Sequence, residues 1–236
     1  MSYPERKIEV DARCFIAALV HAIPDIHRPM LGSVAIVPSA TGQGVLCIGA
    51  NGASMAIVHD ESGSTNGKWI CSVPDHIRAM MLAEKISEED DYGDPIPAWF
   101  PQERFGRLHF HGNEMSLFSF DAALLFTAEA KPWQGDYVNW LKPFRPDNFD
   151  TSKRGREAIT FNPDFLGRHK RSIDILRNSD TYYPSIYLTA GESEPFVVKD
   201  VSTPKYLGLL MPCLVKLDSG NLLPDFLTAE QESAST

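Results

Sequence analysis

The stretch of the sequence with the clearest candidate binding residues is "NPDFLGRHKRSIDIL", residues 162–176. Its apolar residues recur at helical spacing, and Arg168, Lys170 and Arg171 fall on the side away from the apolar stripe. Residues 151–177 carry a net charge of +4, which leaves −13 for the rest, because the whole chain carries −9. The cations of this region are Lys153, Arg154, Arg156, Arg168, Lys170, Arg171 and Arg177. Cations on one side of a helix attract phosphate groups weakly and without sequence preference. The alternative, which is more common, is that such a charge run is only the solvated face of a helix.

Two further groups of side chains have residue types that bind metal ions. The sequence "HFH" places His109 and His111 on one face of a strand, and residues 88–91 form an acidic run. A same-face histidine pair is common on half-exposed strands, no nearby residue completes a zinc site, and an acidic run is typical of a hydrated loop. The sequence also lacks the G-x-x-x-x-G-K-[ST], G-x-G-x-x-G and H-E-x-x-H motifs. We therefore expect a protein that is not an enzyme and that needs no metal or cofactor.

Composition narrows the class of protein further. The chain has 236 residues, of which 43% are hydrophobic, and no apolar run approaches the roughly 18 residues of a membrane span. Its first residues are polar and charged, unlike a signal peptide. The four cysteines are widely spaced and lie in apolar contexts, as expected for buried free thiols in a reducing cytoplasm. The composition predicts a globular cytoplasmic protein with no membrane contact.

Strand and helix patterns recur three times along the chain. The first copy runs from the strand "KIEV" through a helix capped by Asp11 to "GSVAIVP", "GVLCIGA" and "SMAIVHD". The second has "KWICSV", a helix after Pro74, and "RLHFHG", "EMSLFSF" and "ALLFTAEA". The third has "EAITF", a helix with Asn162 as N-cap and Pro163 in its first turn, and "PSIYLTAG", "PFVVKDV" and "YLGLLMPCLVKL". A strand–helix–three-strand unit repeated over 5–62, 67–130 and 157–217 predicts an α+β fold.

Three segments lie outside the repeats. Residues 84–103 are acidic and rich in proline, which predicts a solvated loop inserted after the second helix. Residues 131–155 mix prolines with aromatic residues and are expected to be extended and packed through those aromatic rings. The last residues, 218–236, turn polar and small and are expected to form a tail.

These stretches resemble a bacterial-type DNA sliding clamp, the beta subunit of DNA polymerase III. The resemblance is carried by "CFIAALVHAI", "RPMLGSVAIVP", "GVLCIGANGASMAIVHD" and "WICSVPDHIRAMM" in the first two repeats, and by "ITFNPDFL", "IYLT" and "FVVKDV" in the third. The turn "GDYVNW" and the closing "LLMPCLVKL" are its most specific parts. Val138 stands where the family usually has proline, and Cys213 stands where a second methionine is common.

The resemblance implies a function for the basic helix. In a sliding clamp the sheets form the outside of a ring, the helices line the hole, and the ring tethers a polymerase or another DNA enzyme to the duplex. The resemblance thus implies sequence-independent contact with duplex DNA, and processivity rather than catalysis. The residues that would contact the DNA are Arg168, Lys170, Arg171, Arg177, Lys153, Arg154, Arg156 and Arg78.

Clamp partners, such as polymerases and loader-type proteins, dock short Leu/Phe-rich peptides into a surface pocket, and the resemblance implies one here. The matching positions are Val138, Lys142, Pro143, Leu209, Leu210, Met211 and Pro212. The alternative interpretation is that residues 209–212 simply finish a buried strand.

The chain is shorter than an ordinary clamp subunit, which has six repeats in three domains. We divide it into a complete clamp domain (1–146), a half domain (147–217) and the tail. A lone repeat leaves a sheet edge unpaired, so we expect a homo-oligomer: a dimer through the third repeats, and in a bolder version a tetrameric ring closed by free edges at the first repeats. The alternative function is a clamp-fold interaction module that does not encircle DNA and that binds or modulates replication partners.

Overall fold

The structure is a computed structural model that describes most of the three repeats. The described residues are 5–24, 27–82, 88–89, 95–96, 105–130, 132–133, 135, 137–140, 161–177, 184–187 and 195–212. Lys142, Pro143, Lys153, Arg154, Arg156, the strand "EAITF" up to residue 160 and the tail lie outside them.

The first repeat contains β1 (Lys7–Asp11), α1 (Ala12–Leu19), β2 (Val34–Pro38), β3 (Val45–Ala50) and β4 (Ser54–Asp60). The second contains β6 (Trp69–Cys71), α2 (Asp75–Leu82), β9 (Phe105–His111), β10 (Glu114–Ser119) and β11 (Leu124–Glu129). The third contains α3 (Pro163–Leu176), β13 (Pro184–Tyr187), β14 (Phe196–Asp200) and β15 (Tyr206–Leu210). The short elements are the 3₁₀ helix η1 (Pro29–Gly32), β5 (Ser64–Thr65), β7 (Glu88–Glu89), β8 (Pro95–Ile96) and β12 (Pro132–Trp133). The predicted order of elements is confirmed in the first two repeats and, from its helix onward, in the third.

Local sequence explains where these helices begin. The Asp11 carboxylate accepts a hydrogen bond from the Arg13 backbone N–H at 2.8 Å, and the Asn162 side chain accepts one from the Asp164 N–H at 2.9 Å. Both predicted N-caps are therefore confirmed. The predicted acidic loop differs from expectation, because β7 and β8 pair within it as a short antiparallel hairpin.

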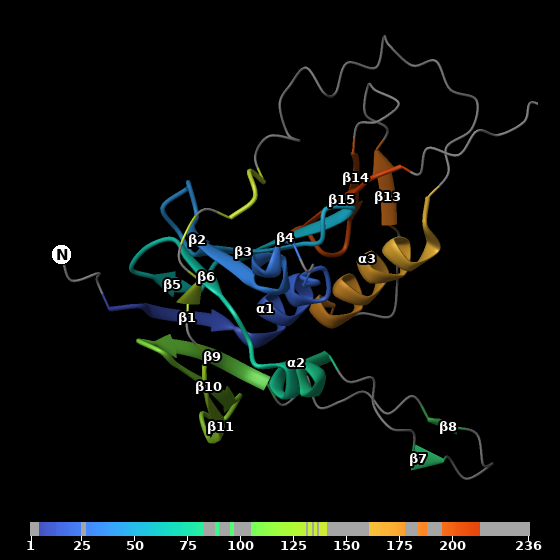
Figure 1. Ribbon diagram of the computed structural model, residues 1–236. Coiled ribbons are helices and arrows are strands. Elements are labelled where there is room, and N and C mark those ends of the chain that lie inside the picture. The colour runs from blue at the N-terminus through green and yellow to red at the C-terminus, as the bar shows by residue number, and fades with distance from the viewer. Residues whose placement is uncertain are drawn as a thin grey trace, which may run out of the picture.

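The first two repeats exchange strands. β1 of the first repeat pairs with β9 of the second, and β6 of the second pairs with β2 of the first. The five-stranded sheet has the order β11-β10-β9-β1-β5, and the eight-stranded sheet begins β12-β6-β2-β3-β4. Figure 1 shows these two sheets with the helices packed beside them. Neither repeat can complete its sheet alone, so the two fold as one unit.

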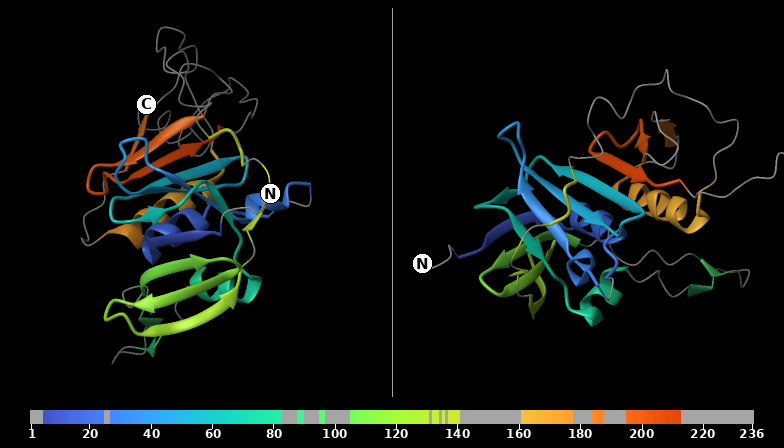
Figure 2. Two further views of the ribbon diagram at one scale, coloured as in Figure 1. Left: turned by 90° about the vertical axis from the view of Figure 1, so that its left-hand side faces the viewer. Right: turned by 45° about the horizontal axis from the view of Figure 1, so that its top comes forward.

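The third repeat continues the eight-stranded sheet. β15 pairs antiparallel with β4, from Tyr206 opposite Val58 to Leu210 opposite Ser54, and β14 and β13 follow. α3 packs against α1, as the views in Figure 2 agree. The expectation of a free sheet edge at the first repeat is therefore wrong, because the chain's own third repeat covers β4.

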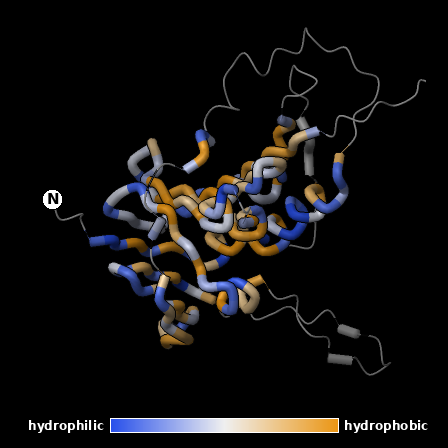
Figure 3. Tube along the Cα trace, in the orientation of Figure 1, coloured by the Kyte–Doolittle hydropathy of each residue, from blue (hydrophilic) through white to orange (hydrophobic). Residues whose placement is uncertain are grey.

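Two apolar clusters hold the fold together. The larger lies between the sheets and the three helices and includes almost every residue of α1. The smaller lies on the other face of the eight-stranded sheet and includes Leu209, and Tyr137, Val138 and Trp140 pack against it. Apolar residues therefore follow the sheets and α1 in Figure 3. The predicted packing of the linker through aromatic rings is confirmed for Tyr137 and Trp140. Within the described residues, no helix is long and apolar enough to cross a membrane.

We expect Gly49→Ala to destabilise the protein, because β3 approaches α1 too closely for a side chain. A Cβ at Gly49 would lie 1.9 Å from the Ala18 carbonyl oxygen. The expected loss is about 1–3 kcal/mol in the free energy of unfolding, measured by urea denaturation. Gly167→Ala is the control, because Gly167 lies in helix α3 with open space around its Cβ position, and it should gain about 0.5–1 kcal/mol. Equal effects of the two substitutions would contradict this account of the packing.

Candidate functional site

The C-terminal end of α1 is bound by an arginine of α2. The Arg78 Nη1 donates to the Gly32 carbonyl oxygen at 2.8 Å, and its Nη2 donates to the carbonyl oxygens of Leu19, at 3.3 Å, and Ala22. The last carbonyls of a helix lack partners within the helix and carry the negative end of its dipole. Arg78 therefore neutralises the end of α1 and ties α2 to it.

Two arginines of α3 bind helix ends in the same way. The Arg168 Nη1 donates to the Val20 carbonyl oxygen at 3.2 Å, beyond the end of α1, and the Arg171 Nη2 donates to the carbonyl oxygen of Leu82, the last residue of α2. Burial lowers the pKa of Arg168; the charge of Asp164 acts in the opposite direction, and the charge of Arg171 adds to the lowering. Three of the predicted DNA-contacting residues are thus brought together as bridges among the three helices.

Two further cations, Lys170 in α3 and Arg177 directly after its last residue, share an acidic partner. The Lys170 Nζ lies 2.5 Å from an Asp174 carboxylate oxygen, and the Arg177 Nη1 lies 3.5 Å from the other oxygen. The Lys170 side chain is 64% exposed, whereas that of Arg177 is only 7% exposed. Lys170 is therefore the predicted α3 contact whose charge most clearly faces solvent.

The predicted peptide pocket is brought together only in part. Val138 and Leu209 belong to the same apolar cluster on the outer face of the eight-stranded sheet. The half-buried Met211 and Pro212 follow directly, and the Met211 N–H donates to the Ala53 carbonyl oxygen at 2.8 Å. Leu210 alternates to the helix-facing side of β15 and is fully buried, so it does not line an outer groove. Tyr137 also packs against this cluster, as the sequence predicts for the linker, and its hydroxyl donates a hydrogen bond to the Ser33 carbonyl oxygen at 3.0 Å.

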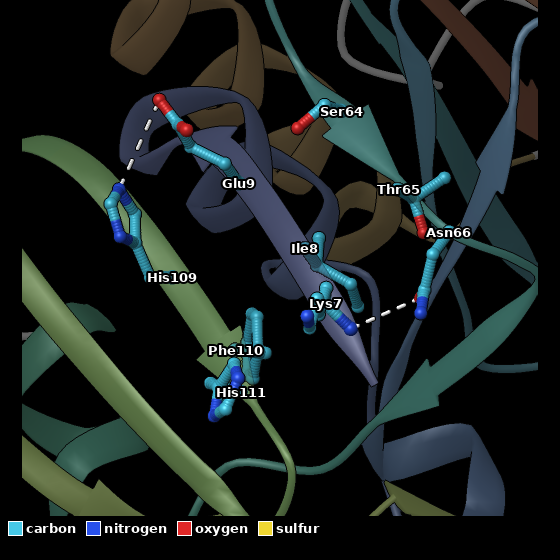
Figure 4. Close-up of a pocket in the computed structure, with 9 residues that line it drawn as sticks. All are labelled: Lys7, Ile8, Glu9, Ser64, Thr65, Asn66, His109, Phe110 and His111. Atoms are coloured by element: carbon cyan, nitrogen blue, oxygen red, sulfur yellow. Dashed lines mark hydrogen bonds and ion pairs between the residues drawn. The ribbon is translucent and has the colours of Figure 1, made fainter. Parts of the chain in front are cut away.

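His109 and His111 lie on one face of the five-stranded sheet, as the sequence predicts. The His109 Nε2 lies 3.9 Å from a Glu9 carboxylate oxygen, and the His111 Nδ1 lies 3.6 Å from one of Glu5. Both histidines line a pocket of about 420 Å³ together with Lys7 and Glu9, and Figure 4 shows these side chains. Nowhere in the described part of the chain do three His, Cys, Asp or Glu side chains gather as metal ligands would.

A buried polar cluster that sequence reasoning missed lies where the third repeat meets the first. The His169 Nδ1 lies 2.6 Å from the Tyr206 hydroxyl, and that hydroxyl lies 3.4 Å from the His21 Nε2. The His21 Nδ1 is 3.0 Å from the Ser54 hydroxyl, and the two imidazole rings are 4.6 Å apart. Burial lowers the pKa of His169 to about 4 and that of His21 well below its usual value. Both imidazoles are therefore neutral in the folded protein at neutral pH.

These repeats, with shared sheets on one side and helices on the other, form the DNA-clamp fold. The structure resembles DNA polymerase III subunit beta from Borrelia burgdorferi, with a TM-score of 0.54 and 13% identity over 89% of this chain and 64% of that one. For the DNA polymerase III beta subunit of Thermotoga maritima the TM-score is 0.55, with 8% identity over 91% of this chain and 66% of that one. For the DNA polymerase sliding clamp of Caulobacter crescentus the TM-score is 0.52, with 14% identity over 91% of this chain and 68% of that one.

At such low sequence identities the similarity establishes only the fold. It confirms that the chain has the fold of the sliding clamps that the sequence resembles. The chain spans about two thirds of the length of these neighbours. No protein-family model and no curated protein matches the sequence.

We expect stability to fall as the pH drops from about 6.5 towards 4, because the unfolded chain binds protons at His21 and His169 that the folded chain excludes. The loss is up to about 1.4 kcal/mol per pH unit for each histidine, measured as the free energy of unfolding in urea. His169→Asn should flatten this slope. His111→Asn is the control, because the His111 side chain is 64% exposed, and it should leave the slope unchanged. A wild-type slope in His169→Asn would refute the assignment to the buried pair.

Proposed function

We propose that this chain is a cytoplasmic, clamp-like processivity factor. It contacts duplex DNA through its helix side, without sequence preference and without catalysis or a cofactor, and it tethers a polymerase or another DNA enzyme. The observation that carries the proposal is the continuation of one sheet from the first repeat into the third, with α3 set against α1. Repeats that join by sheet continuation with their helices on one side can extend around a duplex.

The cations of the helix side support the DNA contact. Lys170 projects from α3 into solvent, and Arg78, Arg168 and Arg171 lie at the helix ends nearby. Arginine has five N–H donors, so a guanidinium that binds between one and three carbonyls, as these do, keeps donors for phosphate. Arg177, Lys153, Arg154 and Arg156 remain part of the proposed contact surface.

The outer apolar cluster supports the tethering role. Val138, Leu209, Met211 and Pro212 provide aliphatic walls and a thioether, which suit the Leu and Phe side chains of a short peptide. We propose that this surface, with Lys142 and Pro143, takes the peptide of a polymerase or loader-type protein.

The second candidate function is a clamp-fold interaction module that binds or modulates replication partners without encircling DNA. One observation favours it specifically: three of the five described cations proposed to contact DNA already donate to backbone carbonyls. In that role the arginines hold the helices together and no phosphate contact is required.

DNA topology separates the two functions. An encircling clamp should stay on nicked circular duplex at a salt concentration that releases it from the same molecule made linear, because a ring slides off free ends. Gel filtration of the protein–DNA mixture measures the retained fraction. Equal retention on both forms, or none on either, would favour the interaction module.

The same experiment tests the helix side with two charge reversals. Lys170→Glu should lower DNA affinity several-fold and reduce the slope of log affinity against log salt by about one or more. Lys7→Glu is the control. It changes the charge of the protein by the same amount as Lys170→Glu, but Lys7 is exposed on the outward face of β1. Equal losses in the two variants would show a general charge effect and contradict contact through the helices.

We expect a Leu/Phe-rich clamp-binding peptide to bind with a Kd in the micromolar range, about −8 kcal/mol. Met211→Glu should abolish this binding, measured by fluorescence anisotropy, because it places a charge in the apolar groove. Val201→Glu is the control: Val201 is 77% exposed in the turn before β15, at the other end of the strand from Met211. Binding that survives Met211→Glu would place the peptide elsewhere.

A further inference from the structure

The outer apolar cluster is only partly covered in the described part of the chain. Leu209 is buried in it, but Val138 and Leu207, which pack against it, are half-buried. Met211 is also half-buried, and it lies on the same face because side chains alternate along the strand that leads to it. Half-buried apolar side chains that share one sheet face are stabilised when a further apolar segment covers them.

The sequence continues from this surface into a segment of matching chemistry. The Met211 N–H donates to the Ala53 carbonyl oxygen, and the described part of the chain ends at Pro212. Residues 213–227 read "CLVKLDSGNLLPDFL". The large apolar residues of the tail, 218–236, are Leu222, Leu223, Phe226 and Leu227. Leucine and phenylalanine side chains suit the aliphatic walls and the thioether of the cluster.

Charge favours the same end of the cluster. Residues 218–236 contain four acidic residues and no Lys or Arg. The exposed Arg28 directly precedes η1, and a Cβ added at Gly52 would lie 3.3 Å from its Nη2. Gly52 belongs to the β3–β4 turn, to which the Met211 N–H also bonds, and Leu31 of η1 belongs to the outer cluster. A cation therefore borders the cluster near Met211 and attracts an acidic segment.

We propose that residues 222–227 of this chain cover the outer apolar cluster beside Met211 and compete there with the peptide of a partner. The proposal rests on the proposed peptide surface and adds its regulation. Residues 218–221, "DSGN", have the types that favour a reversal of the chain. A reversal there would bring Phe226 level with Pro212 and Leu227 level with Met211, because equal numbers of residues lie on either side of it.

The short connection makes even weak binding effective. A segment tethered by about ten residues is present at an effective concentration on the order of 1 mM, so an affinity of about 100 μM keeps the surface occupied roughly nine-tenths of the time. A partner peptide binds only to the remaining fraction, so its apparent affinity falls about tenfold. The tail thus limits docking to partners that bind tightly or that are present at high concentration.

The first test uses the full chain with Leu223→Asp and Phe226→Asp combined. This variant should bind a labelled Leu/Phe-rich clamp-binding peptide about tenfold more tightly than the wild type in fluorescence anisotropy, because its own segment no longer competes. Ala229→Asp combined with Ala234→Asp is the matched control, since it adds the same charge to the tail outside the segment. The control should keep the wild-type affinity, and both variants leave every described residue unchanged.

A second measurement identifies the surface directly. A labelled peptide with the sequence of residues 219–229 should bind the Leu223→Asp, Phe226→Asp variant more tightly than the wild type, whose own segment occupies the site. Adding Met211→Glu to that variant should abolish the binding, because the charge lies in the apolar surface. Val201→Glu, added in the same way, should leave the binding unchanged.

Equal, measurable affinities of the wild type and the tail variant for the Leu/Phe-rich peptide overturn this proposal and leave the peptide surface standing. Binding of the 219–229 peptide that survives Met211→Glu also overturns it. So does a wild-type affinity that rises as the protein is diluted, because the competitor is then the tail of a second copy. If the 219–229 peptide binds and the Leu/Phe-rich peptide binds neither protein, the tethering function fails and the tail contact stands.

Discussion

The antiparallel pairing of β15 with β4 is the constraint on which the candidate sites depend. Side chains alternate across a strand, so this register sends Tyr206 towards the helices and Leu209 to the outer face. A slip of one residue would exchange the two faces and place Tyr206 among the aliphatic residues of the outer cluster. The register of one strand pair therefore decides both the buried polar cluster and the composition of the proposed peptide groove.

The same pairing explains why an acidic chain collects cations on one helix. It holds α3 against α1, where the C-terminal carbonyls of α1 and α2 would otherwise present unsatisfied negative dipoles close together. Arg168 and Arg171 bind these carbonyls, and Lys170 is left to face solvent. The excess positive charge of this region therefore stabilises the contacts between the helices, in addition to any attraction for phosphate.

The local features of the fold could be predicted from the sequence, and the partners across the chain could not. Asp11 and Asn162 mark helix starts because a cap acts within three residues, and hydropathy periods show the repeats. By contrast, Arg168 contacts a carbonyl 148 residues away, and a helical wheel gives no neighbour for it. Leu209 and Leu210 are equally apolar in sequence, and only the strand register shows that they face opposite sides.

Both β4 and β11 end a repeat, yet the third repeat covers only β4, and buried polar groups explain the choice. Beside β4, the His21 imidazole and the Ser54 hydroxyl form the polar cluster that β15 and α3 complete with Tyr206 and His169. β11 instead offers Phe126 and Ala128 on its helix-facing side. At that edge the Tyr206 hydroxyl would be buried without a partner, at a cost of about 1–3 kcal/mol. The polar cluster thus favours the first repeat over the second as the neighbour of the third.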